Sequence, residues 1–374
     1  MEKTEPPIVA PSQRSLDELA QTLANWLPTR IEGASDIAIT DLRYPRGAGL
    51  SHETILFTAS WRVDGVAHER GLVVRIKPRP DKSVYLDDQF VDQFRIMRAA
   101  RQSGHVRVAE VLWLEEDPAI LGAPFFVMER MDGRVPVSYP SYVTHGWLAE
   151  ATPAERRVAW EDSVRQLAAI QLIPHQDVPF LDLGTGGTGF EQEIDRWRRY
   201  VAWITEPGPL PFVERAFAEI LRTAPANPPP GIVWGDARIG NMMFDDSFRV
   251  LAVMDWEQVS LGGALHDLGW WLSNEHHRTV GSGVARPDGI GSAEETCALW
   301  SEVTGIPVTD IEWYTVFACF KMNCLRTHML DANWYPPTPG NDWGECPGWH
   351  FVAEHLGIAP PEPMPRRILW EDVR

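Results

Sequence analysis

Short stretches in the first third of the chain alternate apolar with polar residues, which is the pattern of half-buried β-strands. Asp64-Gly65 separates two of these stretches and predicts a tight hairpin turn. Two helices are also expected here: leucines recur at helical spacing from Ser15, a capping residue, to Leu27, and Asp87–Ser103 carries apolar residues on one face. The expected strands are Ile37–Tyr44, Ile55–Val63, Leu72–Ile76, Val108–Glu115 and Phe125–Glu129.

The pattern changes after Met131, where apolar residues recur at helical spacing over longer segments. Strands with a helix, followed mainly by helices, predict an α+β fold with two lobes. The Pro-rich segment from Pro336 is expected to wrap the surface. The expected helices are Pro153–Leu172, Glu191–Ile204, Pro211–Thr223, Ala264–Asn274, Ala293–Thr304 and Asp310–Leu330. The expected divisions are a flexible tail at 1–14, a β-rich N-lobe at 15–130 and a helical C-lobe at 131–374, with a connector near 128–132.

Composition places the chain among globular proteins and argues against some partners. It has 374 residues, enough for two lobes, of which 44% are hydrophobic and 23% charged. Its net charge of −18 argues against nucleic acid or an anionic membrane as the main partner, because both need a basic surface. We find no signal-peptide pattern, no apolar run long enough to span a membrane and no CxxC pair, so we expect a cytoplasmic protein with reduced thiols and no membrane partner.

The segment 231–257 carries the side chains with the clearest chemistry. Asn241 follows Asp236 by five residues, and Asp255 follows Asn241 by fourteen, across an expected hairpin. Phosphoryl transfer from ATP needs a carboxylate that orients and deprotonates the acceptor hydroxyl, and oxygen ligands that hold Mg²⁺ against the phosphates. The catalytic loop of protein kinases has the same layout. The strands of the hairpin are expected at Met242–Phe244 and Val250–Met254.

This segment resembles the aminoglycoside phosphotransferase and choline kinase group of kinase-like enzymes, and within it the branch of acyl-CoA-dehydrogenase-associated bacterial phosphotransferases. The resemblance implies a protein-kinase-like fold, with Asp236 as catalytic base and Asn241 and Asp255 as Mg²⁺ ligands. Asp267 would brace the catalytic loop, and Arg238 would either balance phosphate charge or hold the loop by an ion pair. The family pattern HGD-x-R-x-GN, hDWE and DP-x-x-DL appears here as Trp234–Asn241, Asp255–Glu257 and His266–Leu268.

The resemblance also predicts where the nucleotide binds. Gly47, Gly49 and Ser51 match the loop that covers the nucleotide, where backbone amides approach the phosphates. The alternative for them is an ordinary glycine-rich hairpin. Glu129 and Met131 lie in the stretch that resembles the hinge between the lobes, where backbone groups would contact adenine.

Several positions depart from the family pattern. The basic residue of the third strand, usually lysine, falls at Arg75, which can bind phosphate through two bonds; Lys77 shares its face of the strand and is an alternative. The helix glutamate that would pair with this cation aligns with Gln93, so nucleotide binding is expected to be weaker or differently braced. Trp234 replaces the usual histidine and Gly263 an aspartate, which we interpret as packing differences.

Together these features predict an ATP- and Mg²⁺-dependent phosphotransferase that acts on a hydroxyl of a small molecule. One alternative is a non-catalytic nucleotide-binding protein of the same fold, and another is an unrelated metal-dependent hydrolase. The acceptor is expected to bind near residues 190–205 and 270–345, which are rich in tryptophan. Together with Glu275, Asp331 and Asp342 they suggest a partly apolar hydroxylated compound, unless the tryptophans only pack between helices.

Overall fold

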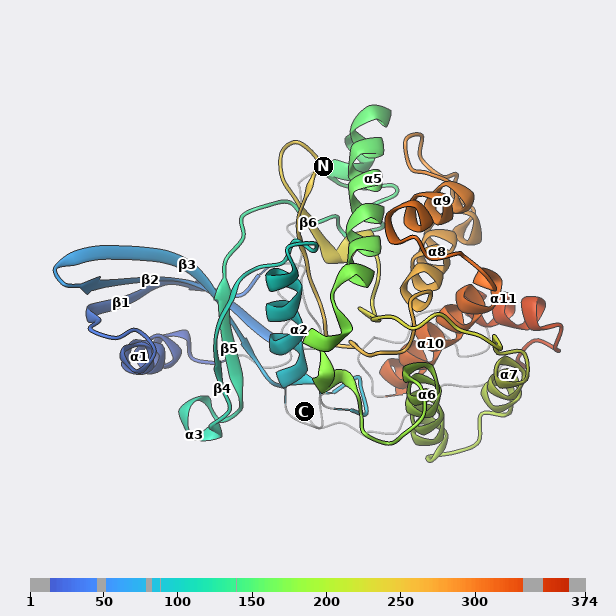
Figure 1. Ribbon diagram of the computed structural model, residues 1–374, viewed down its shortest axis with the longest axis horizontal. Helices are drawn as coiled ribbons and strands as arrows, with labels where there is room; N and C mark the ends of the chain where they lie inside the picture. The colour runs from blue at the N-terminus through green and yellow to red at the C-terminus, as the bar shows by residue number, and fades with distance from the viewer. Residues whose placement is uncertain are drawn as a thin grey trace.

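Two lobes of unequal size lie side by side in the computed structural model (Figure 1). The structure describes residues 14–45, 52–78, 83–87, 89–138, 140–331 and 346–362. The N-lobe, at the left of Figure 1, is built on an antiparallel sheet, and the C-lobe, at the right, is mainly helical. The predicted α+β class is therefore confirmed.

The sheet of the N-lobe is antiparallel throughout, with strand order β1-β2-β3-β5-β4. Its β2–β3 turn is Asp64-Gly65, as predicted, with φ angles of 50° and 78° that suit a two-residue hairpin. Because the turn is tight, β3 pairs with β2 from Val66 onward, well before the predicted start at Leu72. The strands are β1 Ser35–Arg43, β2 Glu53–Val63, β3 Val66–Ile76, β4 Val111–Glu115 and β5 Phe125–Glu129.

Successive side chains of β5 point to opposite faces of the sheet, and a different helix packs on each face. Helix α1 (Leu16–Trp26) packs on the face that carries Phe125, and α2 (Phe90–Ser103) packs on the face that carries Phe126. The rings of Trp26 and Phe125 meet edge to face with their centroids 4.8 Å apart. A slip of one residue in β5 would exchange these faces, so the two buried aromatic rings fix the register of the sheet.

Helix α10 (Ile311–Asp331) packs against α6, α7, α8 and α11, and these contacts form much of the core of the C-lobe. Three helices begin at a capping box, in which a serine or threonine and a glutamate three residues later satisfy each other's backbone N–H groups. The other elements are α3 Pro118–Leu121, α4 Trp147–Glu150, α5 Pro153–Ala169, α6 Gly189–Thr205, α7 Pro211–Arg222, β6 Met242–Phe244, β7 Val250–Val253, α8 His266–Arg278, α9 Ala293–Thr304 and α11 Pro347–Leu356.

The prediction of an irregular tail from Pro336 is wrong for residues 347–356. They form α11, which begins with Pro347 in its first turn and buries Trp349, Val352 and Ala353 in the core of the C-lobe. Proline is well suited to the first turn of a helix, because its missing N–H would have had no helical partner. The prolines that suggested a tail therefore include one that starts a helix.

Two helices begin later than predicted. Asp87 precedes α2 instead of starting it, and its carboxylate binds Arg199 of α6 at 2.7 and 2.8 Å. Helix α8 begins at His266 rather than Ala264 and continues to Arg278. In the first case the residue forms an ion pair with the other lobe.

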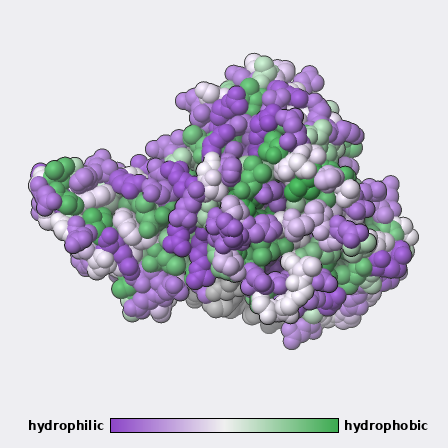
Figure 2. Space-filling model, in the orientation of Figure 1, coloured by the Kyte–Doolittle hydropathy of each residue, from purple (hydrophilic) through white to green (hydrophobic). Residues whose placement is uncertain are grey.

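The surface mixes residue types, and the face drawn in Figure 2 shows hydrophilic and hydrophobic residues interspersed over both lobes. None of the helices in the described part of the chain is long and apolar enough to cross a membrane.

A buried ion pair joins α6 to α10. Lys321 Nζ lies 3.5 Å from Glu193 Oε1, and both side chains are less than 5% exposed. Glu193 also accepts hydrogen bonds of 2.9 Å from Trp197 Nε1 and from Ser260 Oγ. Burial alone would raise the pKa of Glu193, but Lys321 and Arg196 hold it at about 2. The carboxylate is therefore ionised and depends on these cations.

We expect Lys321→Met to destabilise the protein by about 3 kcal/mol at pH 7, because it leaves a buried carboxylate without its main partner. In the wild type this carboxylate contributes stability above its unfolded pKa of 4.5, which is lost as the pH falls toward 2. In the variant, burial raises the pKa of Glu193, so protonation relieves the destabilisation as the pH falls. In urea unfolding, the difference in the free energy of unfolding between the wild type and the variant should therefore become smaller from pH 7 to pH 4.

The double variant Glu193→Gln with Lys321→Met is the control. It removes both charges and keeps an amide that can bind Trp197 and Ser260, so it should be more stable than Lys321→Met at pH 7 and should lack the pH dependence. A double variant no more stable than the single one would contradict the charge argument.

Candidate active site

The β6–β7 hairpin brings Asn241 and Asp255 together although they are fourteen positions apart in the sequence. Residues Ile239–Asn241 form a 3₁₀ turn closed by a 2.9 Å bond from the N–H of Asn241 to the carbonyl of Arg238. Across the hairpin, the N–H of Met254 donates to the carbonyl of Asn241 at 2.9 Å. Asp255 follows directly and has a φ of 65° in the left-handed region. The predicted hairpin is confirmed, and it sets an amide and a carboxylate on neighbouring strand ends.

Three donors hold the carboxylate of Asp236. Arg238 Nε and Asn241 Nδ2 donate to its Oδ2 at 2.9 and 2.6 Å. Trp270 Nε1, from α8, donates to its Oδ1 at 3.0 Å. Arg238 also donates to Ser138 Oγ at 2.9 Å, so in this structure it holds the loop, which is one of the two roles that the sequence left open.

Asp267 braces the turn before Asp236. Its Oδ2 accepts the N–H of Trp234 at 2.6 Å and its Oδ1 accepts the N–H of Gly235 at 2.9 Å. Burial raises the pKa of Asp267 to about 6, although both N–H groups lower it. Gly235 has a φ of 110°, and a Cβ there would lie 2.3 Å from Gln258 Cβ, so only glycine fits this turn. The backbone bonds are those expected of a bracing aspartate.

The two departures from the family pattern near this turn both have a structural reason. The indole of Trp234, which replaces histidine, is fully buried and donates to the carbonyl of Met254 at 2.8 Å. It thereby joins the catalytic loop to the residue before Asp255. Gly263, in place of aspartate, has a φ of 121°, which side chains rarely adopt. Both positions therefore serve packing and backbone geometry.

The side chains of Asn241 and Asp255 fit a Mg²⁺ site. Asn241 Nδ2 faces Asp236, which leaves its carbonyl Oδ1 as the atom that could bind a cation. Desolvation and the nearby carboxylate of Glu257 raise the pKa of Asp255 to about 7, while Arg75 lowers it. A divalent cation would offset this excess of negative charge. Because no group of three or more His, Cys, Asp or Glu side chains in the described ranges could hold a metal, the remaining ligands would be phosphate and water oxygens.

Arg75 reaches this centre from β3. Its Nη2 lies 3.3 Å from Asp255 Oδ1, and its buried Nε has no hydrogen-bond partner among the described residues. A buried guanidinium N–H without a partner is costly, and a phosphate oxygen would satisfy it. Lys77 lies just beyond the end of β3, where its own N–H donates to the carbonyl of Pro124 at 3.0 Å.

Gln93 does not face Arg75. Its Nε2 lies 3.1 Å from His52 Nε2, and His52 Nδ1 lies 2.9 Å from Glu257 Oε2. The hydroxyl of Tyr85 donates to the other oxygen of Glu257 at 2.9 Å. A neutral histidine with its proton on Nδ1 would satisfy both of its contacts. The expected different bracing therefore runs from α2 through His52 to Glu257, a connection that the sequence analysis missed.

The hinge stretch is partly occupied by bonds within the N-lobe. The N–H of Glu129 donates to the carbonyl of Glu110 at 2.9 Å, and the N–H of Arg130 donates to the carbonyl of Gly71 at 3.0 Å. These two donors are therefore not available to adenine, and Met131 supplies the next N–H along the chain. Gly47, Gly49 and Ser51 lie outside the described residues.

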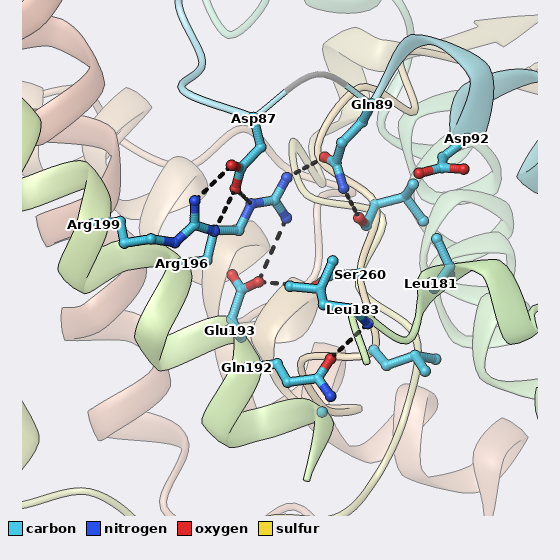
Figure 3. A pocket seen from close by; sticks show the side chains of 13 residues that line it. Asp87, Gln89, Asp92, Leu181, Leu183, Gln192, Glu193, Arg196, Arg199 and Ser260 are labelled. Atoms are coloured by element: carbon cyan, nitrogen blue, oxygen red, sulfur yellow. Dashed lines mark hydrogen bonds and ion pairs between the residues drawn. The ribbon is translucent and has the colours of Figure 1, made fainter. Parts of the chain in front are cut away.

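A cavity of about 240 Å³ lies between α6, the start of α2 and residues 259–261. Figure 3 shows Asp87 between Arg196 and Arg199 on one wall. These charges are bound to one another, and leucines and Val259 supply apolar lining. Glu193 also lines the cavity. It binds Lys321, which lies over the ring of Trp270, and Trp270 in turn contacts Asp236. Asp236 itself does not line the cavity.

The described tryptophans in the expected acceptor region, residues 190–205 and 270–345, are mostly core residues. Trp197, Trp270 and Trp271 are buried. Trp270 nevertheless contacts Asp236, and one signal could have revealed it: it follows Asp267 by three residues, so both lie on the same face of α8. Glu275 accepts the hydroxyl of Tyr142 at 2.5 Å. Asp342, Trp334 and Trp343 lie outside the described residues.

Comparison with known proteins gives the relationships of the chain. Residues 47–300, more than half of it, match the sequence profile of a group described as the phosphotransferase enzyme family. The protein named Probable acyl-CoA dehydrogenase IBR3, from Arabidopsis thaliana, is 26% identical over 300 residues, which cover 75% of this chain and 35% of that protein. Acyl-CoA dehydrogenase family member 10 of Mus musculus is 29% identical over 272 residues, 69% of this chain and 24% of that protein. The chain thus spans about a third or less of these relatives.

A crystal structure from Ralstonia eutropha, provisionally named an aminoglycoside phosphotransferase, has a similar fold. It superposes with a TM-score of 0.66 at 25% identity and covers 89% of this chain and 98% of that one. This likeness confirms the predicted kinase-like fold.

We expect Asp267→Asn to destabilise the protein by about 1–3 kcal/mol, because the amide can accept only one of the two backbone N–H groups and turns its own NH₂ toward the other. Urea unfolding would measure the loss. The control is Asp246→Asn in the β6–β7 turn, where the side chain is fully exposed and the change should have little effect. Equal stabilities of the two variants would contradict the bracing role.

Proposed function

The chain belongs to the phosphotransferase enzyme family, and we propose that it is an ATP- and Mg²⁺-dependent kinase that phosphorylates a hydroxyl group of a small molecule. The observation that carries this proposal is the joint geometry of Asp236, Asn241 and Asp255. Asn241 binds the carboxylate of Asp236 through its side chain, and its backbone carbonyl accepts the N–H of Met254, the residue before Asp255. A base and two metal ligands held in one hydrogen-bonded unit are what phosphoryl transfer requires.

Each residue then has a defined role. Asp236 orients the acceptor hydroxyl and takes its proton, while Arg238 holds this carboxylate in place. Asn241 Oδ1 and the carboxylate of Asp255 would hold Mg²⁺, which supplies charge neutralisation at the phosphates. Arg75 would donate its Nε–H to a phosphate oxygen.

The remaining nucleotide contacts are proposed from the family resemblance. Gly47, Gly49 and Ser51 would cover the phosphates, with Lys77 as a further cation. Met131 would donate its backbone N–H to adenine. Glu129 would contribute its carbonyl, because its own N–H already donates to Glu110.

We propose that the acceptor is not a polycation. Binding several ammonium groups would need carboxylates that are available, but three of those near the candidate catalytic loop in the described part of the chain are engaged within the protein. Glu193 binds Lys321, Asp267 binds the backbone, and Glu275 binds Tyr142. The matched relatives are named for acyl-CoA dehydrogenase. Hydroxylated acyl compounds are therefore the first acceptors to test, in line with a partly apolar substrate.

The main alternative is a nucleotide-binding protein of this fold without catalysis. The observation that favours it is Gln93, which leaves Arg75 without a helix glutamate and contacts His52 instead. The retained base and metal ligands favour an enzyme. A metal-dependent hydrolase that uses no nucleotide is less well supported, because two side-chain ligands are few without phosphate oxygens.

Thermal denaturation tests the metal-nucleotide site. With ATP at a hundredfold excess over its Kd, the wild type should gain about 2.7 kcal/mol of stability and a higher Tm, but only when Mg²⁺ is present. Asp255→Asn should lose this Mg²⁺-dependent gain, because a neutral amide binds the cation weakly. Asp246→Asn, in the same hairpin, should behave as the wild type. No rise in Tm for the wild type at millimolar ATP would exclude the proposed function.

A transfer assay tests catalysis. The wild type should consume Mg-ATP faster with a hydroxylated acyl compound than with kanamycin, and the product should carry the phosphate. Asp236→Asn should slow the transfer by about 10²–10⁴-fold, because it removes the base. Its Tm should still rise with Mg-ATP, which separates loss of chemistry from loss of binding. Binding of ATP without transfer to any acceptor or to water would favour the non-catalytic alternative.

A further inference from the structure

The donors around Asp236 are unequally divided between its two carboxylate oxygens. Oδ2 accepts two hydrogen bonds, from Arg238 and Asn241, whereas Oδ1 accepts one, from Trp270. A carboxylate oxygen has two lone pairs that can accept hydrogen bonds. The contacts of the described residues thus use both lone pairs of Oδ2, and they leave one lone pair of Oδ1 able to accept a further hydrogen bond.

Trp270 is well placed to fix this arrangement. Its side chain is 3% exposed, and its indole carries a single polar group, an N–H that can donate but not accept. It therefore cannot take the acceptor's proton in place of Asp236. Its position on α8, one turn after Asp267, ties it to the helix that also braces the catalytic loop.

The other side of the ring is held by a cation. Lys321 Nζ lies 5.5 Å from the ring centroid of Trp270 and is bound to Glu193. Attraction between an ammonium and the face of an indole is strongest for tryptophan and gains from burial. The indole is thus fixed at both its N–H and its face.

We propose that Trp270 is a positioning residue that selects Oδ1 of Asp236 as the proton acceptor in phosphoryl transfer; this inference rests on the proposed function. The acceptor hydroxyl donates to the remaining lone pair of Oδ1. In the reaction its O–H bond breaks and the proton passes to Oδ1. Its oxygen forms a bond to the γ-phosphorus of ATP, and the bond from that phosphorus to the bridging oxygen of ADP breaks.

The chain offers a matched control for Trp270 in the next residue. Trp271 is 1% exposed, and its Nε1 has no hydrogen-bond partner among the described residues. Substitution by phenylalanine at either position makes the same change of side chain, on the same helix and in the core of the C-lobe. Only Trp270→Phe removes a bond to Asp236.

Tryptophan-¹⁵N-labelled protein gives a test that does not depend on activity. The indole N–H signal that disappears in Trp270→Phe belongs to Trp270, and Trp271→Phe identifies the signal of Trp271 in the same way. Asp236→Asn replaces a charged acceptor by a neutral one, so the Trp270 proton signal should move upfield while that of Trp271 stays in place. A Trp270 signal that does not respond would overturn this inference alone.

Kinetics test the positioning role. With Mg-ATP and either a transfer substrate or water as acceptor, Trp270→Phe should lower kcat by about ten- to hundredfold, as expected for a lost hydrogen bond to a charged group. The KM for ATP should stay within about twofold of the wild type, because Trp270 contacts Asp236 and none of the residues proposed to bind ATP or Mg²⁺. Trp271→Phe should retain most of the wild-type kcat.

Two results would contradict the proposal in different ways. Equal losses of kcat in Trp270→Phe and Trp271→Phe would show that only packing matters, and the positioning role would be wrong. A wild type that binds Mg-ATP but transfers phosphate neither to water nor to an acceptor would overturn the proposed function, and with it the assignment of Oδ1 as base.

Discussion

The geometry of the site depends on two hydrogen bonds that the buried carboxylate of Asp267 accepts from the backbone of Trp234 and Gly235. The tight turn at Gly235 points two N–H groups inward, where no helix or strand could pair them, and unpaired buried donors are costly. One side chain satisfies both. Because Asp236 comes next in the chain, its direction follows from this contact. The helix that supplies Asp267 therefore helps to set the geometry of the candidate site and is not only part of the core.

A second constraint is the crowding of negative charge. Glu257 and Asp236 both raise the pKa of Asp255, and desolvation raises it further. Arg75, from the N-lobe, offsets part of this charge by binding Asp255. His52, also from the N-lobe, contacts Glu257 through its Nδ1. One ion pair and one polar contact thus join the lobes at the point where the proposed nucleotide would lie. The compensation is incomplete, since the pKa of Asp255 remains about 7, and such a site is suited to a cation.

Features with a local cause could be predicted from the sequence, and features with a tertiary cause could not. The Asp64-Gly65 turn and the catalytic hairpin follow from neighbouring residues, and the bracing aspartate from a motif. Gln93 could be recognised as a departure, but nothing indicated that His52, 41 residues away, would meet it. The tryptophans of α8 were ambiguous because composition does not say where an indole N–H points. The position of Trp270 relative to Asp267 would have singled it out. Asp267 was expected to face the loop that carries Asp236, and a residue three positions later on the helix faces the same way.

Under the proposed function, the ion pair between Lys321 and Glu193 would limit what the C-lobe can recognise. The ammonium of Lys321 lies against Trp270, and its carboxylate partner, Glu193, lines the neighbouring cavity. A site that binds polycations would need such carboxylates to face its ligand, whereas here an internal lysine already pairs with one. Recognition of an acceptor would then rest on its hydroxyl, which meets Asp236, and on apolar contacts. One fold could in this way serve different acceptors, because the charges around the site are reassigned while the loop that carries the proposed base is kept.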